Sequence, residues 1–310
     1  MITVFGSLNV DYIFQVPHLP TPGETVLASG MQVLPGGKGA NQAVAAARAG
    51  AKVCMVGAVG RDGLSEIALA GLLDVGVDTN AVAQSPKPTG TAAINVDAQG
   101  ENAITVSSGA NLDARGDSLD EKNLTPRTTV LLQMEVPMTA MADLVQRARR
   151  KEACIVWNLA PMQSVDLALL KQVDCLIVNE GELNQLHSKL HQIPRPNHYS
   201  AKDVEQKARD IFTLTGQSVV VTLGVNGTLA VHNNTLLAVP ALAISPVDTV
   251  GAGDAFTGAF TAALDRGETF PVALRWGNVA GGLACLETGA QSSLPTAAKI
   301  SEHLAALPGA

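Results

Sequence analysis

The residues best suited to chemistry lie in a short glycine-rich stretch, residues 248–254, which reads Asp-Thr-Val-Gly-Ala-Gly-Asp. A pattern of small and apolar residues predicts a helix over Asp254–Leu264. Backbone N–H groups converge at the amino end of a helix, where the helix dipole also favours an anion. Asp254 would face the same point, and a carboxylate there can accept the proton of an attacking hydroxyl. The pattern favours phosphoryl transfer to an alcohol, with a purely capping role for Asp254 as an equally supported alternative.

A second glycine cluster, residues 36–41, reads Gly-Gly-Lys-Gly-Ala-Asn and opens a helix of small residues. Its spacing matches neither a P-loop nor a dinucleotide-binding fingerprint, so a nicotinamide oxidoreductase is poorly supported. The backbone can approach a polyhydroxylated ligand closely here, with Lys38 and Asn41 supplying hydrogen bonds. Tight helix packing is the alternative interpretation.

Polar side chains also follow several of the expected strands. Glu135, Asn158, Asn179 with Glu182 one helical turn later, and Thr222 all stand where a buried apolar run ends. The carboxyl ends of parallel strands share one edge of a sheet, where such sheets bind ligands. We therefore expect a crevice there.

Asn9 and Asp11 alternate across a strand end, so both side chains can point to one side. Two short polar groups in that position suit sugar hydroxyls, and a turn-stabilising role is nearly as well supported.

Short apolar runs alternate with helical patterns along most of the chain, which predicts an α/β fold. The composition of the 310 residues agrees, because 46% are hydrophobic but only 3% are aromatic. A core of small aliphatic side chains is typical of buried parallel sheets covered by helices. We expect one domain over 1–310, with a doubly wound, mostly parallel sheet sandwiched by helices.

Two segments, Tyr12–Leu34 and Thr91–Val106, break this rhythm with turn residues and alternating stretches. They predict a small antiparallel β-sheet beside the loops that carry the motifs. Insertions in such a place are more often lids than ornaments. We expect a lid formed by about 12–35 and 88–107.

The charge balance excludes some partners. The 28 acidic residues outnumber the 21 basic ones and give a net charge of −7, which disfavours nucleic acid. The longest region of small apolar residues, Ala43 to Gly60, is interrupted by Arg48 and Lys52 and does not predict a membrane span. The first residues carry no secretory pattern. We expect a cytoplasmic protein with small-molecule partners.

Three histidines, His187, His191 and His198, raise the hypothesis of a zinc site, since the first two are one helical turn apart. No carboxylate or cysteine completes a ligand spacing in the sequence. The polar stretch Gln185–Ser200 therefore reads as a surface loop.

The two glycine clusters, in this order and at this separation, resemble the paired signatures of the ribokinase-like, or PfkB-type, carbohydrate kinases. Further similarities are Asn9-Val10-Asp11, residues 21–24 (Thr-Pro-Gly-Glu), Gln133-Met134-Glu135 and residues 179–182 (Asn-Glu-Gly-Glu). The resemblance covers nearly the whole chain. It implies an ATP-dependent sugar kinase that requires Mg²⁺ and is activated by K⁺, with a small β lid that often also joins two subunits in a homodimer.

The resemblance also assigns roles to individual residues. It makes Asp254 the base that deprotonates the sugar hydroxyl. The amides of three neighbouring residues form the anion hole for the transferred phosphoryl group: Gly251, Ala252 and Gly253. The residues that hold the sugar are Asn9, Asp11, Gly37, Lys38, Asn41, Glu135 and Asp254.

Nucleotide and cation positions follow from the same resemblance. The ATP site takes Asn179, Thr222, Leu223, Gly224, Gly227, Gly253 and Asn278. Asn278 stands where many relatives have a histidine, so a different side chain would make the contact with adenine here. Glu182 and Asn179 position Mg²⁺ through water. The monovalent cation lies behind the anion hole, held by oxygens at Asp248, Val250, Ala284, Glu287, Gly289 and Ser293.

The expected acceptor is D-ribose, which would give ribose 5-phosphate and ADP. A polar amide at Asn9 suits a sugar with a 2-hydroxyl group, whereas an apolar residue would suit a deoxy sugar. The alternatives are a kinase for deoxyribose, another pentose, a hexose or a nucleoside, and a sugar- or nucleotide-binding sensor without catalysis.

Overall fold

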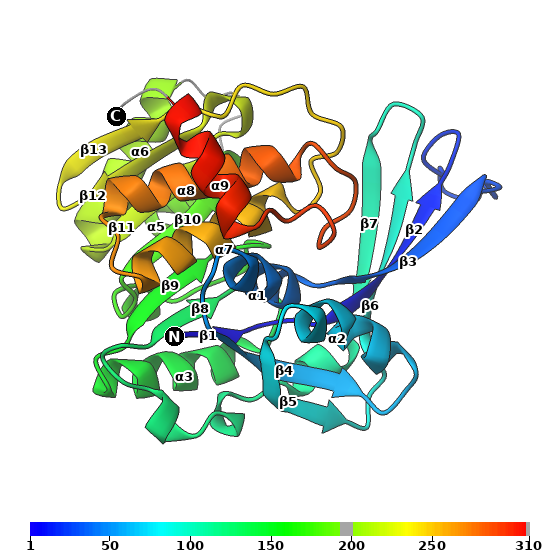
Figure 1. Ribbon diagram of the computed structural model, residues 1–310, viewed down its shortest axis with the longest axis horizontal. Helices are drawn as coiled ribbons and strands as arrows, with labels where there is room; N and C mark the ends of the chain where they lie inside the picture. Colours follow the sequence, from blue (N-terminus) through cyan, green and yellow to red (C-terminus); the bar gives the residue numbers. More distant parts are fainter. Residues whose placement is uncertain (193–200, 308–310) are drawn as a thin grey trace.

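The computed structural model describes residues 1–192 and 201–307, which form two sheets and the helices around them (Figure 1). The larger sheet contains β1 (Ile2–Phe5), β4 (Val53–Gly60), β5 (Asp78–Ser85), β8 (Thr129–Leu132), β9 (Cys154–Asn158), β10 (Cys175–Asn179), β11 (Ser218–Thr222), β12 (Thr228–His232) and β13 (Thr235–Val239). Its order is β13-β12-β11-β10-β9-β8-β1-β4-β5. The strands from β11 to β5 run parallel, and β12 and β13 add an antiparallel edge.

Helices cover both faces of this sheet. One face carries α1 (Lys38–Arg48), α2 (Leu64–Asp74), α7 (Ala252–Asp265), α8 (Phe270–Ala284) and α9 (Ala297–His303). The other carries α3 (Met138–Arg150), α4 (Leu167–Leu170), α5 (Glu180–His191) and α6 (Ala201–Thr215). Short 3₁₀ turns lie at Gly109–Asp113, Gly116–Ser118, Glu121–Asn123, Gly224–Asn226 and Leu304–Ala306.

Alternation along the strands divides the core into two layers. In β1, Ile2 and Val4 pack on the α1 and α7 side, whereas Phe5 packs on the α3 side. Every residue of β1 and β4 is buried, because helices cover both faces of the sheet. These strands therefore lack the alternation of apolar and polar residues that a half-exposed strand has. The expected doubly wound α/β sheet is therefore confirmed.

The smaller sheet contains β2 (Asn9–Gln15), β3 (Gly30–Gly36), β6 (Gly90–Val96) and β7 (Asn102–Ser107), in the order β3-β2-β6-β7. The two segments that break the α/β rhythm thus meet in one sheet, which stands away from the larger sheet at the right of Figure 1. Its two outer pairs are antiparallel, whereas the central pair, β2 and β6, is parallel because these strands come from different segments of the chain.

Two elements differ from the sequence-based expectation. Residues 185–191, expected as part of a surface loop, belong to α5, and α6 follows over Ala201–Thr215. Val204, Ala208 and Ile211 form the buried stripe of α6, but the charged residues between them hide this periodicity in the sequence. The rest of the expected loop, 193–200, lies outside the described residues.

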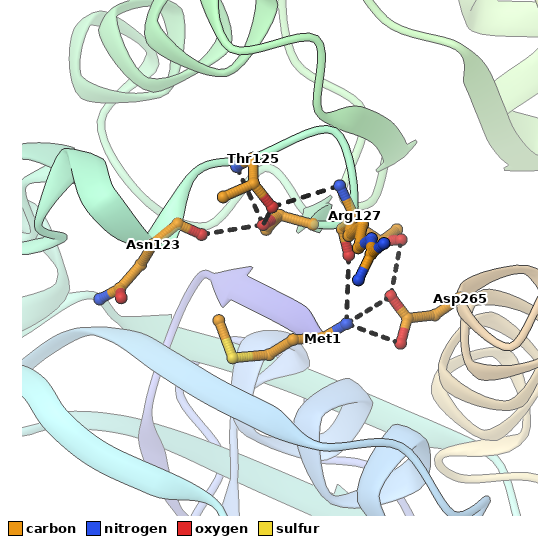
Figure 2. Close-up of polar contacts among 7 residues, drawn as sticks. Met1, Asn123, Thr125, Arg127 and Asp265 are labelled. Atoms are coloured by element: carbon orange, nitrogen blue, oxygen red, sulfur yellow. Dashed lines mark hydrogen bonds and ion pairs between the residues drawn. The ribbon is translucent and has the colours of Figure 1, made fainter.

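The carboxyl-terminal end of α7 is anchored near the start of β1 (Figure 2). The Asp265 carboxylate lies 2.9 Å from the amino group of Met1 and accepts a hydrogen bond of 3.0 Å from the Thr129 hydroxyl. This anchor holds one end of α7 while its other end enters the crevice. Across the described ranges, the helices are too short or too polar to cross a bilayer.

Candidate active site

Two adjoining cavities lie at the carboxyl ends of the parallel strands. The smaller one has a volume of about 240 Å³, and its wall includes Lys38, Asn179, Glu182 and Asp254. The larger one has a volume of about 470 Å³ and lies between the β11–β12 turn, the 241–246 segment and α8. Gly253, Thr222 and Thr249 border both cavities. The expected crevice is therefore present, with room for two adjacent ligands.

The amino end of α7 forms the junction between the cavities. Gly251 precedes the helix with φ at +78°, a left-handed conformation that glycine adopts without strain. In this turn, the Ala252 amide donates a hydrogen bond of 3.3 Å to the Thr249 carbonyl. Among the described residues, the amides of Gly251 and Gly253 donate no such bond to the backbone. The amides of both glycines are therefore available to an anion, whereas that of Ala252 already stabilises the turn.

Asp254 lies in the first turn of α7 and is only 7% exposed. Its Oδ2 accepts a hydrogen bond of 3.0 Å from Asn41 Nδ2, and its Oδ1 accepts one of 2.8 Å from Gln42 Nε2. Both donors come from α1, so the two glycine motifs meet in the fold. Side-chain amides therefore orient the carboxylate.

Asn9 and Asp11 lie on one face of β2, where the small sheet joins the crevice. Gly36 pairs with Asn9, and the Asp11 carboxylate lies directly over Gly36. Asn111 donates to Asn9 Oδ1 at 2.7 Å and also pairs with the Leu8 backbone, which fixes the Asn9 side chain. Sequence reasoning did not identify Asn111, because it lies in a 3₁₀ turn without a recognisable motif.

Glu135 connects the end of β8 to the start of α1. Its Oε2 accepts hydrogen bonds from the Ser7 hydroxyl at 2.5 Å and from the Lys38 backbone amide at 3.1 Å. Glu135 thus positions the glycine cluster that opens α1. Neither Glu135 nor the other expected sugar residues Asn9, Asp11, Gly37 and Asn41 line the smaller cavity, which Lys38 and Asp254 border.

The site concentrates negative charge around one lysine. The pKa of Asp11 is raised from 3.8 to about 7 by burial, and further by the charges of Glu135 and Asp254, while Lys38 opposes the shift. The Asp254 carboxylate raises the pKa of Lys38 above its ordinary value, against the effect of burial. Lys38 therefore carries a positive charge at neutral pH.

Asn179 and Glu182 form a capping box at the start of α5. Asn179 Oδ1 accepts from the Glu182 amide and Glu182 Oε2 accepts from the Asn179 amide, both at 2.8 Å. Burial raises the pKa of Glu182, and the nearby Asp254 adds to this, while the Asn179 amide and Lys38 oppose it. A partly buried carboxylate that borders a cavity together with Asp254 is suited to a divalent cation.

The larger cavity contains most of the expected nucleotide residues. Its wall includes Thr222, Gly224, Gly227, Gly253 and Asn278, whereas Leu223 is not part of it. The side-chain amide of Asn278 is already hydrogen-bonded within the protein.

Asn278 Nδ2 donates to the carbonyls of Val239 and Pro240 at 2.9 and 3.0 Å, and its Oδ1 accepts from the Thr228 hydroxyl. Asn278 therefore shapes the wall through its bonds to the backbone.

The expected monovalent-cation residues come from two loops that Asp248 joins. Its Oδ1 accepts from the Val250 amide at 2.9 Å and its Oδ2 from the Gly289 amide at 3.0 Å. The Ser293 hydroxyl is buried without a hydrogen-bond partner among the described residues, so its oxygen is suited to be a cation ligand. The Glu287 side chain instead lies exposed, 3.5 Å from Lys299, and Ala284 ends α8.

The histidine cluster lies on the opposite face of the larger sheet. The sequence spacing offers no carboxylate for this cluster, but the fold brings Asp210 from α6 next to His187 and His191. His187 Nε2 lies within hydrogen-bond distance of Asp210 Oδ2, 3.0 Å away, which explains the inward position of this histidine between α5 and α6. His198 lies outside the described residues.

Comparison with known proteins agrees with this geometry. Residues 1–297 match the pfkB family of carbohydrate kinases. A ribokinase from Haemophilus influenzae is 34% identical over 307 residues, which cover 98% of each chain. A deoxyribokinase from Salmonella typhi is 30% identical, again over 98% of each chain.

Among solved structures, that of Arabidopsis thaliana ribokinase complexed with ribose and ATP aligns with a TM-score of 0.87 and 29% identity, over 98% of each chain. The chain therefore belongs to the pfkB family of carbohydrate kinases, phosphotransferases that use an alcohol group as acceptor.

Proposed function

We propose that this enzyme transfers the terminal phosphoryl group of ATP to the 5-hydroxyl of D-ribose, forming ribose 5-phosphate and ADP. The observation that carries the proposal is the position of Asp254. Its carboxylate lies in the first turn of α7, beside the unpaired amides of Gly251 and Gly253 and in the wall of the smaller cavity.

Asp254 acts as general base in this proposal. It takes the proton of the sugar hydroxyl as the hydroxyl oxygen attacks the phosphorus, and the bond from phosphorus to the ADP oxygen breaks. The amides of Gly251 and Gly253, with a smaller part for Ala252, stabilise the charge on the transferred group. Lys38, held positive by Asp254, supports the same charge from the other side.

The groups on β2 favour a sugar with a 2-hydroxyl. Because Asn111 donates to Asn9 Oδ1, the NH₂ group of Asn9 is the end that can donate to a sugar oxygen. Asp11 accepts from sugar hydroxyls, and Gly37, Asn41 and Glu135 complete the site. A deoxy sugar would leave the Asn9 amide without a partner, which costs affinity.

The residues also fit the expected cations. Glu182 and Asn179 would hold hydrated Mg²⁺, which when bound neutralises charge on the ATP phosphates. Asp248, with oxygens from Val250, Gly289 and Ser293, would hold K⁺ behind the anion hole. Ala284 and Glu287 complete this set only through backbone oxygens, because the Glu287 carboxylate faces Lys299.

We further propose that the whole chain forms one kinase unit in which residues of about 12–35 and 88–107 close over the sugar as a lid. The same sheet is proposed to join two copies of the chain. Its edge strand β7 is exposed along its whole length and includes Ile104 and Val106, which are 54% and 48% exposed. Large apolar side chains in such a place favour association.

A sugar panel tests the proposed substrate. ADP release from Mg²⁺-ATP is measured with ribose, deoxyribose, arabinose, xylose, fructose and common nucleosides, each in K⁺ and in Na⁺. We expect ribose to give the highest kcat/KM, with faster turnover in K⁺. A clear preference for deoxyribose would replace the substrate and keep the mechanism, whereas ligand binding without ADP release would support the sensor alternative.

A further inference from the structure

A chain of buried amides leads from the end of β8 to the carboxylate of Asp254. Gln133 Nε2 donates to Gln42 Oε1 at 2.7 Å, and Gln42 Nε2 donates to Asp254 Oδ1 at 2.8 Å. Both glutamine side chains are fully buried. Neither residue is among the expected sugar, nucleotide or cation ligands.

The direction of every amide in this chain is determined by groups that can only accept. The Ile177 carbonyl accepts from Asn158 Nδ2 at 3.1 Å, so Asn158 presents Oδ1 to the Gln42 NH₂ group, 3.0 Å away. Asp254, as a carboxylate, also only accepts. The two hydrogens of the Gln42 NH₂ group are thereby used, and its oxygen must face Gln133.

The backbone leaves space for this arrangement. A Cβ atom on Gly6, just after β1, would lie 2.0 Å from Gln133 Oε1. Gly6 is therefore the residue type that lets the Gln133 amide lie beneath α1. A larger residue would displace Gln133 and leave Gln42 without its donor.

We infer that Gln133 is a positioning residue for the base, acting through Gln42. Without the Gln133 donor, the buried Gln42 oxygen has no hydrogen-bond partner, so the Gln42 amide is held less firmly and its NH₂ group can move away from the carboxylate. The held Gln42 NH₂ group instead stabilises the ionised Asp254 and aims its remaining lone pairs at the hydroxyl. This inference rests on the proposed role of Asp254 as base.

The test compares Gln133→Met, Gln133→Glu, Gln42→Met and the double variant Gln42→Met/Gln133→Met with the wild type. Methionine keeps the length of the side chain and removes the donor. Glutamate keeps its shape and can donate only while it is protonated, so its effect should appear as the pH rises. The control is Gln217→Met, the same exchange at the amino end of β11, where Gln217 donates to the Lys171 carbonyl. Thermal unfolding shows which variants are folded.

We expect both Gln133 variants to lower kcat about tenfold, the effect of one misaligned hydrogen bond to a charged group, with KM for sugar and ATP nearly unchanged. The acidic limb of the pH profile of kcat should move to higher pH, because a Gln42 NH₂ group that Gln133 no longer holds stabilises the ionised carboxylate less well. The double variant should lose no more than Gln42→Met alone, since Gln133 acts through Gln42.

A folded Gln133→Met enzyme with wild-type kcat and pH profile would overturn the inference, as would additive losses in the double variant. If Gln42→Met does not fold, the shifted pH profile of both Gln133 variants decides in its place. The Asp254→Asn variant distinguishes failure of the proposed base from failure of the positioning role. If Asp254→Asn stays active, Asp254 is not the base. If Asp254→Asn is inactive but the Gln133 variants are unaffected, only the positioning role of Gln133 is rejected.

Discussion

At the scale of single residues, the candidate site is a set of acidic groups held apart by amides and one lysine. Asn41 and Gln42 hold Asp254, Asn111 holds Asn9, and the Ser7 hydroxyl and the Lys38 amide hold Glu135. Such directed contacts keep reactive groups in place before a ligand arrives, which is how a preorganised site lowers a barrier.

The buried carboxyl group of Asp11 makes stability depend on pH. Its pKa is raised from 3.8 to about 7, so the folded protein holds this proton more tightly than the unfolded chain does. The free energy of unfolding that Asp11 contributes is therefore present below pH of about 4 and decreases as pH rises to about 7.

Asp11→Asn removes this titration and keeps the shape of the side chain. In the absence of sugar, we expect the melting temperature of this variant to rise relative to that of the wild type as the pH increases from about 4 to about 8. Thermal unfolding of both proteins across this range measures the difference. Parallel curves would show that Asp11 titrates at its ordinary pKa.

At the scale of helices and strands, the sequence predicts the site best where a motif and an element boundary coincide. The glycine run 248–254 predicts a helix start, and α7 begins within it, at Ala252. Asn179 with Glu182 has the spacing of a capping box, which the structure contains. Strand ends were visible because buried apolar runs stop at polar residues.

What the sequence could not predict is which distant residues meet. Gln133 donates to Gln42, and Gln291 donates to Asn41, across about ninety residues or more of sequence, and the packing of α1 brings both pairs together. Asn111 meets Leu8 and Asn9 in the same way, across about a hundred residues. Asp210 reaches His187 for the same reason, because α6 folds back on α5. Pairings of this kind depend on tertiary contacts rather than on local patterns.

At the scale of the whole molecule, the two sheets contribute different parts of the candidate site. Both cavities lie at the edge of the larger sheet, and the smaller sheet carries Asn9 and Asp11, of which Asp11 lies close enough to Asp254 and Lys38 for their charges to affect its pKa (Figure 1). Movement of the smaller sheet as the proposed lid would change access to the proposed sugar site, and none of the described residues that line the larger cavity comes from this sheet.

The exposed strand β7 predicts the oligomeric state. Ile104→Glu combined with Val106→Glu places two charges on this strand, and we expect it to convert a homodimer into a monomer of 32.0 kDa. Light scattering coupled to gel filtration measures the mass. Leu73→Glu, on the exposed side of α2, is the matched control and should remain dimeric. A monomeric wild type would contradict the proposed interface.

The measurement that tests the central claim most directly is ribose-dependent ADP release by the wild type and by Asp254→Asn, at saturating Mg²⁺-ATP in K⁺. Asparagine preserves the shape of the side chain and cannot accept the hydroxyl proton. We expect a decrease in kcat on the order of 10²-fold to 10⁴-fold, with the fold and nucleotide binding retained. Near-full activity in Asp254→Asn would contradict it.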